Sequence, residues 1–320
     1  MRQRWFWLAC LAFCLASPSW ADLPRCLFVS SYHPGYAWSD GVQRGIDAVL
    51  RGRCELRQFD MDTKRHKTQA DKEAAARRAR ALIEQWHPQV VIAADDNAAR
   101  YLIAPYFRDA AIPFVFCGVN WSVAEYGFPY SNVTGMIEVA PVRPLIREAQ
   151  LLTGNGDHFF YLAADTATER KNLARFQKVA EALGLSVEYR LVSRRDQWVA
   201  AYRQAQDHPY LVIGSHAGIA DWNFAAARRA IAGHTRRLSV TSHEWMMSMS
   251  MLGFTKIPAE QGRWAAEAAL AILEGVKPSE IPIIANQRWD LWMNESLLRE
   301  AGIELPLRLR GRAKRFETLQ

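Results

Sequence analysis

Polar side chains follow the short apolar runs of this sequence, at positions where they could hold a small molecule. The run Val90–Ala94 is followed directly by Asp95 and Asp96, and a carboxylate at such a position can pair with a ligand amine. Thr166 and Ser215 follow two later apolar runs, and their hydroxyl groups can donate hydrogen bonds to a ligand carboxylate. The pattern therefore predicts a binding site for a small organic molecule with charged or polar ends.

The loop after the first apolar run, residues 30–39, is rich in aromatic and hydroxyl side chains. Aromatic side chains often line pockets for small organic ligands, so this loop suits the wall of such a pocket. The alternative interpretation is that these side chains only pack the loop down, and Asp96 with Asn97 could equally cap a helix that starts there. Asp95 is then the preferred ligand contact. The candidate ligand-binding residues are Ser31, Tyr32, His33, Tyr36, Trp38, Asp95, Asp96, Asn97, Asn120, Trp121, Asp165, Thr166, Ser215, His216, Ser242, His243 and Glu244.

Three of these candidates, His33, His216 and His243, could supply three nitrogen ligands to a zinc ion. No two of them have the spacing of a helical metal-binding motif, so no metal and no other cofactor is predicted. The sequence also has no Gly-x-Gly-x-x-Gly after the first strand, no P-loop and no Gly-x-Ser-x-Gly motif. The predicted activity is binding, and an enzyme is not expected.

Alternating strand and helix patterns must position the candidate residues. Short apolar runs such as 26–30, 90–94 and 158–163 alternate with amphipathic segments such as 69–86 and 168–183. This alternation predicts βαβ units and an α/β fold with parallel sheets and helices on both faces. Ligands bind such sheets outside the carboxyl ends of the strands, which is where the candidates lie.

A turn-rich stretch after Cys117 divides the chain into two parts of similar build. The sequence predicts an N-terminal lobe over 22–120 and a C-terminal lobe over 121–244. It also predicts a return to the first lobe near 245–260 and in the C-terminal region. Three crossings are expected, near Gly118–Asn132, Thr241–Trp245 and Gly253–Gln261, and they should act as a hinge. Asp95, His243 and Glu244 are the expected closure contacts.

Residues 1–21 have the features of a secretory signal peptide that is cleaved after Ala21. A short basic start precedes the apolar core Trp5–Ala16, and small residues stand at Ser19 and Ala21. No other segment has the roughly 20 apolar residues that cross a bilayer. The sequence therefore predicts export to the periplasm.

Three cysteines remain after the predicted cleavage. Cys26 and Cys54 each open an apolar run, and a disulfide between them is feasible if the two strands are parallel neighbours. Cys117 is expected to be a small buried hydrophobic residue.

The net charge of +7 is modest for 320 residues, and nucleic acid is not an expected partner of an exported protein. The one dense basic run is a tail over residues 308–320. Contact with anionic lipid is one interpretation of this tail, and a frayed terminus is the preferred one.

Five segments spread over the predicted mature chain carry a family resemblance. They are residues 90–99, 112–120, 132–135, 257–262 and 298–306. In this order and spacing they resemble the substrate-binding proteins of ABC transporters, and among them the tryptophan- and tyrosine-binding-like proteins. The opening Ser31-Tyr32-His33 and the triplet Asp95-Asp96-Asn97 are also similar to a branch that serves as the extracellular sensor part of bacterial histidine kinases.

The resemblance implies a type I periplasmic binding protein with two Rossmann-like lobes. It implies a monomer that closes on a small amino-acid-like or aromatic ligand and delivers it to an inner-membrane ABC permease. One alternative is a sensor subunit that docks on a membrane histidine kinase or cyclase. Another is an exported metal-binding protein on the same fold.

Overall fold

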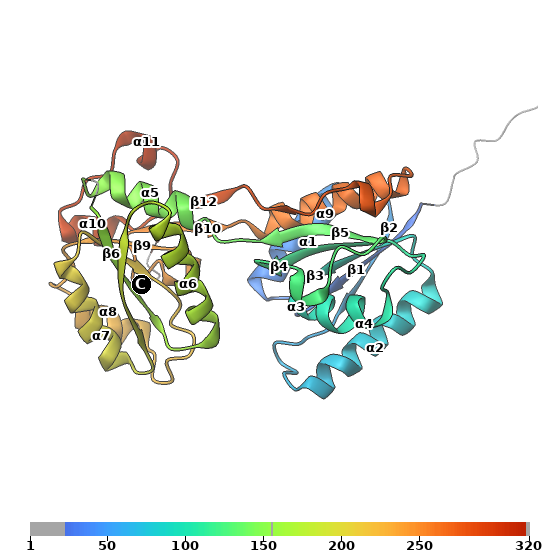
Figure 1. Cartoon of the computed structure of the whole chain (residues 1–320), viewed down its shortest axis with the longest axis horizontal. Helices are drawn as coiled ribbons and strands as arrows, with labels where there is room; N and C mark the ends of the chain where they lie inside the picture. Colours follow the sequence, from blue (N-terminus) through green and yellow to red (C-terminus); the bar gives the residue numbers. More distant parts are fainter. Residues whose placement is uncertain (1–22, 155, 318–320) are drawn as a thin grey trace, which may run out of the picture.

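Two α/β lobes lie side by side and are joined by extended segments (Figure 1). The computed structural model describes residues 23–154 and 156–317, so the predicted signal peptide lies outside the described residues. None of the described helices is both long enough and apolar enough to cross a membrane.

The first lobe is built on a six-stranded parallel sheet. From edge to edge its strands are β11 (Ile284–Ala285), β5 (Val133–Glu138), β4 (Phe114–Asn120), β3 (Val90–Ala94), β1 (Arg25–Ser30) and β2 (Glu55–Asp60). Its helices are α1 (Ala37–Leu50), α2 (Gln69–Trp86), α3 (Asp95–Ala98), α4 (Ala104–Tyr106) and α9 (Pro258–Leu273), with a π-helical turn at Ala99–Ile103. Helices α1 and α9 cover one face of the sheet, and α2 with the short helices after β3 covers the other. Strand β3 is apolar throughout, and β1 is apolar between Arg25 and Ser30, because both faces of these central strands are buried.

The second lobe is built on a seven-stranded sheet. From edge to edge its strands are β13 (Lys314–Arg315), β12 (Trp289–Met293), β10 (Leu252–Lys256), β9 (Leu238–Thr241), β8 (Tyr210–Ile213), β6 (His158–Ala164) and β7 (Ser186–Val192). All neighbours are parallel except β10 and β12. Its helices are α5 (Val142–Leu152), α6 (Ala167–Glu181), α7 (Arg195–Gln204), α8 (Phe224–Ile231), α10 (Glu295–Ala301) and α11 (Leu307–Arg310). Residues of α5, α6 and α10 pack against one face, and those of α7 and α8 against the other.

Helices α1 and α9 approach each other so closely that glycine is required at their contact. A Cβ atom on Gly45 would lie 2.3 Å from the carbonyl oxygen of Ala259, and one on Gly262 would lie 1.9 Å from that of Val42. Larger side chains would push the helices apart. Because α9 belongs to a late part of the chain, this contact joins segments of the first lobe that are far apart in the sequence.

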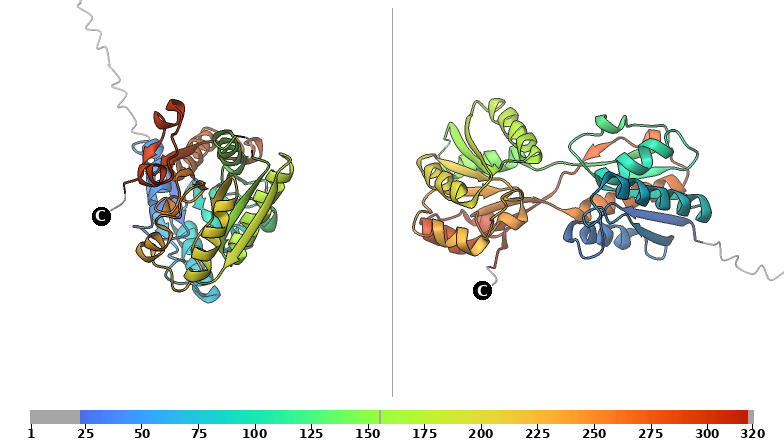
Figure 2. Two further views of the ribbon diagram at one scale, coloured as in Figure 1. Left: turned by 90° about the vertical axis from the view of Figure 1, so that its left-hand side faces the viewer. Right: turned by 90° about the horizontal axis from the view of Figure 1, so that it is seen from below.

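The chain crosses between the lobes three times, from β5 to α5, from β10 to α9 and from β11 to β12 (Figure 2). These crossings are bonded to one another. Lys256 on the second crossing forms an ion pair with Glu138 at the start of the first. The backbone N–H of Val139 donates to the side-chain oxygen of Asn286 on the third, at 2.7 Å. The three connections are therefore braced against one another by side-chain contacts.

These connections differ from the predicted ones. β5 pairs with β4, so the first lobe extends past residue 120, and the first crossing follows Glu138 instead of lying within Gly118–Asn132. β9 and β10 pair with each other in the second sheet, so no crossing occurs at Thr241–Trp245. The predicted crossing in Gly253–Gln261 contains the observed one.

The C-terminal region also differs from the prediction. Its strands β12 and β13 join the second sheet rather than the first. The basic tail, as far as residue 317, is held by ion pairs: Arg308 contacts Glu148, and Lys314 contacts Asp290. A frayed terminus is therefore the wrong interpretation for this part of the tail.

Cys26 and Cys54 form the disulfide that the sequence made feasible, and their Cα atoms lie 5.8 Å apart, within the roughly 7 Å over which a disulfide can form. Cys26 begins the buried part of β1, and Cys54 directly precedes the neighbouring strand β2. Cys117 is a free, buried cysteine in β4, as predicted.

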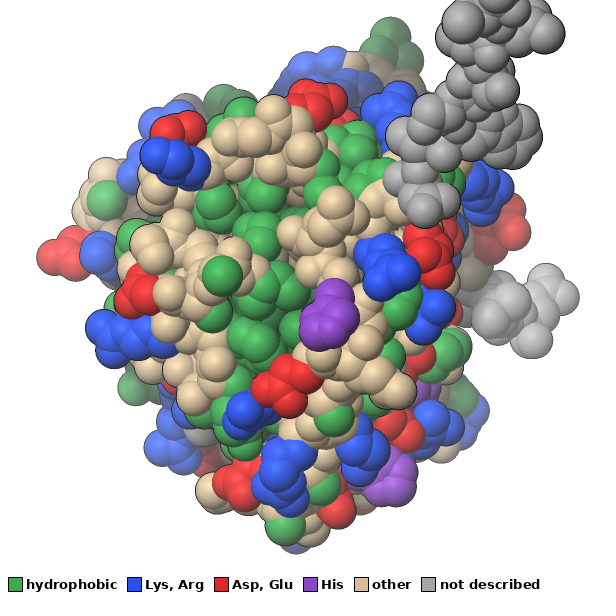
Figure 3. All heavy atoms as spheres, turned by 90° about the vertical axis from the view of Figure 1, so that its right-hand side faces the viewer, with side chains coloured by type: hydrophobic (Ala, Val, Ile, Leu, Met, Phe, Trp, Pro, Cys, Tyr) green, Lys and Arg blue, Asp and Glu red, His purple; other side chains and the backbone are tan. Residues whose placement is uncertain are grey.

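The end of the first lobe that faces away from the second carries charged side chains of both signs around a central group of hydrophobic ones (Figure 3). No single sign of charge dominates this face. The polar side chains that the sequence singles out lie elsewhere, at the carboxyl ends of the strands.

Candidate functional site

Unusual backbone conformations concentrate at the carboxyl ends of the first sheet. Asp95 after β3 has φ 70°, Gly118 near the end of β4 has φ 69°, and Trp121 after β4 has φ 63°. Residues other than glycine rarely adopt this left-handed conformation, and such strain clusters at functional sites. This edge of the sheet is therefore the natural place to look for a site.

Asp95 lies at the centre of this edge. Its side chain is buried, with 2% of the residue exposed, and its Oδ1 accepts a 2.8 Å hydrogen bond from the indole Nε1 of Trp38. A Cβ atom on Gly118 would lie 2.7 Å from the same Oδ1, so glycine leaves room for the carboxyl group. Its second oxygen, Oδ2, has no hydrogen-bond partner among the described residues. A buried polar atom without a partner is costly, so Oδ2 is available for a ligand.

Asp95 and Lys256 have shifted pKa values that lie close to each other. Burial raises the pKa of Asp95 to about 8, although the hydrogen bond from Trp38 and the positive charge of Lys256 oppose this rise. Burial also lowers the pKa of Lys256 to about 8, against the opposing effect of Asp95 and Asp96. The ion pair of Lys256 with Glu138 favours the charged ammonium in the same way. A ligand charge at this site would therefore act on groups that titrate near neutral pH.

Aromatic side chains from the first loop stand beside this carboxyl group. The rings of Tyr32 and Tyr36 meet edge to face with centroids 5.1 Å apart, and the ammonium of Lys64 lies 4.4 Å from the centroid of Tyr32. Burial and the nearby Asp95 raise the pKa of Tyr32 well above its usual value. His33 lies farther out, with its Nδ1 2.9 Å from the carbonyl oxygen of Pro34. The loop thus brings Tyr32, Tyr36 and Trp38 together near Asp95.

Other predicted residues of the first lobe bond within the lobe. The Ser31 hydroxyl donates to the carbonyl of Ala94 at 2.5 Å and accepts from the N–H of Ala98. It therefore ties β1 to the start of α3. The Asn97 amide likewise donates to the Thr63 hydroxyl at 2.8 Å.

Asp96 lies within the first turn of α3, and its side chain does not cap this helix. Its carboxylate accepts from the Asn120 side chain at 2.6 Å and from the Tyr126 hydroxyl at 2.7 Å. Asp96 and Asn120 therefore fix the loop after β4 instead of capping α3, which corrects the capping interpretation.

The second lobe carries a buried polar cluster at the carboxyl ends of β6 and β9. Glu169 accepts a 2.8 Å hydrogen bond from the buried Tyr161 hydroxyl, and its Oε1 lies 3.8 Å from Nε2 of His243. Burial lowers the pKa of His243, while Glu169 opposes this. The ring of His243 lies 4.6 Å from that of Trp245, which is 53% exposed. An exposed indole beside a partly buried histidine and a buried carboxylate is a suitable surface for an organic ligand.

The remaining predicted residues of this lobe have local partners. Thr166 caps α6 by accepting from the N–H of Glu169, and the exposed Asp165 forms an ion pair with Arg170. His216 packs against two aromatic rings, those of Trp222 and Phe224.

Three further predicted residues follow β8 and β9. Ser215 is buried, and its hydroxyl lies 3.4 Å from the Trp245 indole nitrogen. Ser242 is buried and Glu244 is exposed. Of the predicted set in this lobe, His243 and Ser215 therefore lie together around Trp245.

The residues of these clusters that were not predicted include Glu138, Glu169, Trp245 and Lys256. Lys256 ends the apolar strand β10, so its position resembles that of the predicted candidates. Glu169 stands three residues after Thr166, and this spacing favours a cap over a buried cluster. Glu138 and Trp245 give no comparable signal in the sequence.

Trp121 belongs to the first lobe and contacts the second. Its backbone N–H donates to the carbonyl of Glu138, whereas its indole ring packs beside the core of the second lobe. It lines a largely apolar pocket of about 300 Å³ at the crossings, together with Val142, Arg175 and Trp289. Trp121 is therefore not enclosed within one lobe.

Among residues 23–154 and 156–317, no group of three or more histidine, cysteine, aspartate or glutamate side chains is arranged to hold a metal ion. The three histidines considered for zinc are divided between the lobes, with His33 in the first and His216 and His243 in the second.

Comparisons with known proteins place the chain in a family. Residues 32–316 match the family described as ABC transporter substrate binding protein. No curated protein matches.

Several solved structures resemble the fold. A ligand-free, open substrate-binding protein from Clostridium difficile has a TM-score of 0.76 at 11% identity, covering 92% of this chain and 100% of that one. An ABC domain from Streptococcus pneumoniae, solved in complex with L-Trp, has a TM-score of 0.63 at 15% identity over 91% and 99% of the two chains. A conserved domain protein from Vibrio cholerae has a TM-score of 0.64 at 15% identity over 92% and 99%.

At these identities the structural likeness shows the fold, that of the type I periplasmic binding proteins. The family itself rests on a match that spans nearly the whole described chain, and the resemblance noted in the sequence is confirmed. This protein belongs to the ABC transporter substrate-binding protein family.

Proposed function

We propose that this protein binds a small organic ligand with a cationic amine between its two lobes and presents it to an inner-membrane ABC permease. The observation that carries the proposal is the buried carboxyl group of Asp95, which has one oxygen bonded to Trp38 and the other without a partner. An amine would supply the missing hydrogen bond and a compensating charge.

The aromatic side chains favour a ligand that also has an apolar or aromatic body. Tyr32 and Trp38 stand beside Asp95 in the first lobe, and the exposed Trp245 offers an indole in the second. Amino-acid-like and aromatic amines fit both features. The L-Trp complex of the streptococcal neighbour supports this class of ligand.

Contacts from both lobes can form together only when the lobes approach, so ligand binding shifts the population toward a closed state. The braced crossings restrict the motion to a hinge closure. Asp95 on one side and His243 with Trp245 on the other are the proposed closure contacts. Glu244 is exposed beside them and is proposed to contact the ligand or the opposite lobe.

Members of this family are periplasmic or extracellular solute-binding proteins. We place this chain in the periplasm, after cleavage of residues 1–21. The family favours a permease as the reader of the closed surface, and a membrane histidine kinase or cyclase is the alternative reader. Permease and ATPase genes beside its own would favour transport, and kinase or cyclase genes would favour sensing.

The test has two steps. Native mass spectrometry of gently purified protein should reveal a co-purified small amine, which is then titrated by calorimetry into the wild type and the variant Asp95→Asn. We expect Asp95→Asn to weaken binding at least about tenfold, because it removes the charge that pairs with the amine. The matched control is Asp196→Asn, which changes an exposed carboxylate of the second lobe and should leave binding unchanged. Equal affinity of Asp95→Asn and wild type would reject the proposed site.

A further inference from the structure

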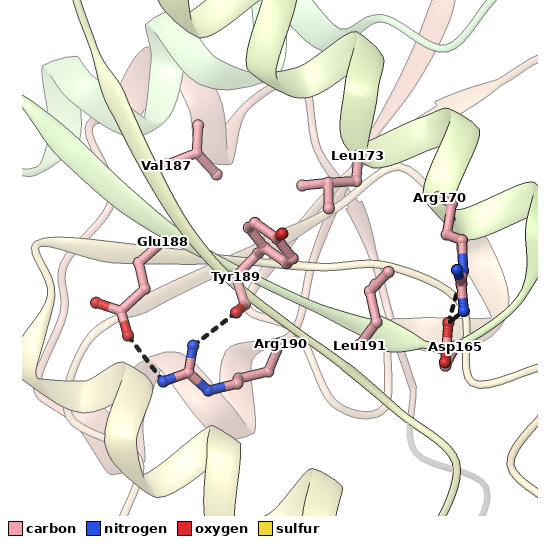
Figure 4. A pocket seen from close by; sticks show the side chains of 8 residues that line it. All are labelled: Asp165, Arg170, Leu173, Val187, Glu188, Tyr189, Arg190 and Leu191. Atoms are coloured by element: carbon pink, nitrogen blue, oxygen red, sulfur yellow. Dashed lines mark hydrogen bonds and ion pairs between the residues drawn. The ribbon is translucent and has the colours of Figure 1, made fainter.

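Strand β7 forms a free edge of the second sheet. It pairs with β6 on one side, and no strand of the described chain pairs with its other side. Beside it lies a broad open hollow, lined by side chains of β7 and α6 (Figure 4). The apolar lining consists of Leu173, Val187, Tyr189 and Leu191. Tyr189 is 45% exposed, so this edge offers unpaired backbone groups and apolar surface together.

The hydrogen bonds at the two ends of β7 show which backbone groups point outward. The N–H of Ser186 donates to Asp157, and the carbonyl of Val192 accepts from Asp165, so the even-numbered residues face β6. The N–H and C=O groups of one residue point to the same side of a strand, and the side alternates along it. The backbone groups of residues 187, 189 and 191 therefore point away from the sheet.

When two copies of β7 are placed antiparallel, the side chains that face each other are complementary. In an antiparallel pair of two copies centred on Tyr189, Val187 faces Leu191 of the second copy. In the same register, Glu188 faces Arg190 of the second copy, and this contact occurs twice by symmetry. Opposite charges and apolar pairs at facing positions stabilise neighbouring strands.

The backbone requires the same register. In an antiparallel pair, facing residues alternate between those that exchange two hydrogen bonds and those that exchange none. Centring on Tyr189 makes the outward-pointing residues 187, 189 and 191 the hydrogen-bonded positions. Glu188 and Arg190 then occupy the other positions, where facing side chains are closest.

The isolated edge is partly covered by its own side chains. Arg190 donates to the outward carbonyl of Tyr189 at 2.8 Å and lies 3.3 Å from Glu188 (Figure 4). A second strand would take over the carbonyl, and the Arg190 guanidinium would be free to contact Glu188 of the other copy. This exchange of partners predicts a reversible association.

We propose that two copies of this chain form a symmetric dimer by antiparallel pairing of their β7 strands. The contact joins the second lobes. β7 lies at the opposite end of the sheet from β10 and β12, which lead to two of the three crossings. This assembly departs from the monomer expected from the sequence and does not depend on the proposed ligand.

Sedimentation velocity over a wide range of protein concentrations tests the proposal through charge reversal. Glu188→Arg and Arg190→Glu should each raise the dimer dissociation constant at least about tenfold, because each places like charges opposite one another twice. The combined variant Glu188→Arg/Arg190→Glu restores opposite charges and should recover the dimer. Glu274→Arg, an exposed reversal in the first lobe, is the matched control and should not change association.

A second variant tests the backbone contact. Tyr189→Pro removes an outward N–H and leaves the bonds to β6 intact, so it should abolish the dimer while the thermal unfolding midpoint stays near that of the wild type. A wild type that remains monomeric at all concentrations would overturn the proposal. A dimer that tolerates Tyr189→Pro, or single reversals that the combined variant does not rescue, would overturn it equally.

Discussion

The guanidinium carbon of Arg175 lies 3.9 Å from the centre of the Trp121 ring, and the two residues belong to different lobes. The Arg175 side chain makes no hydrogen bond or ion pair with another described residue, and burial lowers its pKa. The contact is therefore a direct link between the lobes beside the crossings, and its energy depends on the stacked geometry.

Removing this ring should affect binding more than folding. Trp121→Asn deletes the indole and keeps a residue that tolerates the left-handed backbone of this position. We expect a loss of about 0.5–2 kcal/mol in ligand binding, the usual range of a cation–π contact, with little change in the unfolding midpoint. A double-mutant cycle with Arg175→Gln measures the coupling by calorimetry. Additive effects of the two changes would show that the contact contributes nothing.

The affinity for a cationic amine should depend on pH through Asp95. Because the pKa of Asp95 is raised to about 8, the carboxyl group must lose a proton before it pairs with the amine at lower pH. Affinity should therefore fall about tenfold per pH unit below about pH 8 and level off above it, as long as the amine stays charged. Calorimetry in buffers of different ionisation enthalpy should detect the released proton. A pH-independent affinity, or the same pH profile in Asp95→Asn, would contradict this assignment.

The same group should make folding stability depend on pH. The folded pKa of about 8 lies above the usual unfolded value near 3.9, so the folded protein keeps a proton that the unfolded chain has lost. This stability is fully present below about pH 4 and is lost as the pH rises through about 8. Asp95→Asn should thus be more stable than wild type by on the order of a few kcal/mol at pH 8 and similar to it near pH 4. Urea denaturation at several pH values measures the difference, and a constant gap would refute it.

Much of the fold follows from patterns that the sequence carries locally. The run Val90–Ala94 is buried on both faces and is β3, and the amphipathic segment 69–86 is α2, begun by a capping box at Thr68. The crossings could not be located in this way, because they depend on which sheet a strand joins. β5 and β10 have similar apolar runs, yet one pairs in the first sheet and the other in the second.

The candidate site likewise combines residues that the local sequence indicates with residues that lie far away in the chain. Asp95 is recognisable because it follows a buried strand, whereas its partner Trp38 lies 57 residues earlier and its neighbour Lys256 much later in the chain. Ser31 has a position similar to that of Asp95, but both of its hydrogen bonds go to the backbone around β3. The position of a residue at the end of a strand therefore predicts that it lies near the site. Only the neighbours that are distant in sequence determine whether its side chain keeps a polar atom without a hydrogen-bond partner.

The disulfide should contribute strongly to stability. Closing a loop between cysteines 28 residues apart is expected to contribute about 3 kcal/mol by restricting the unfolded chain. The double variant Cys26→Ser/Cys54→Ser should therefore have a lower urea midpoint, and the free energy of unfolding extrapolated to water should be lower by about that amount. Reducing agent should lower the stability of the wild type and leave the double variant unchanged. Equal stability of the oxidised wild type and the double variant would contradict the expectation.

Ligand binding should make the molecule more compact. Small-angle scattering with a saturating ligand should show a smaller radius of gyration than the free protein, because contacts from both lobes require closure. Asp95→Asn at the same ligand concentration serves as a control for nonspecific compaction. An unchanged radius in the saturated wild type would indicate a rigid scaffold.

The glycine-lined contact between α1 and α9 also determines how late in synthesis the first lobe can complete its fold. These helices begin about 220 residues apart in the chain, at Ala37 and Pro258, so at roughly 5–20 residues per second α1 waits on the order of 10–40 s for its partner. During that interval the N-terminal half lacks the helix that completes its core. The first lobe of a nascent chain would therefore stay incomplete until residues 258–273 have been made, and this delay would suit the export that we propose for this protein.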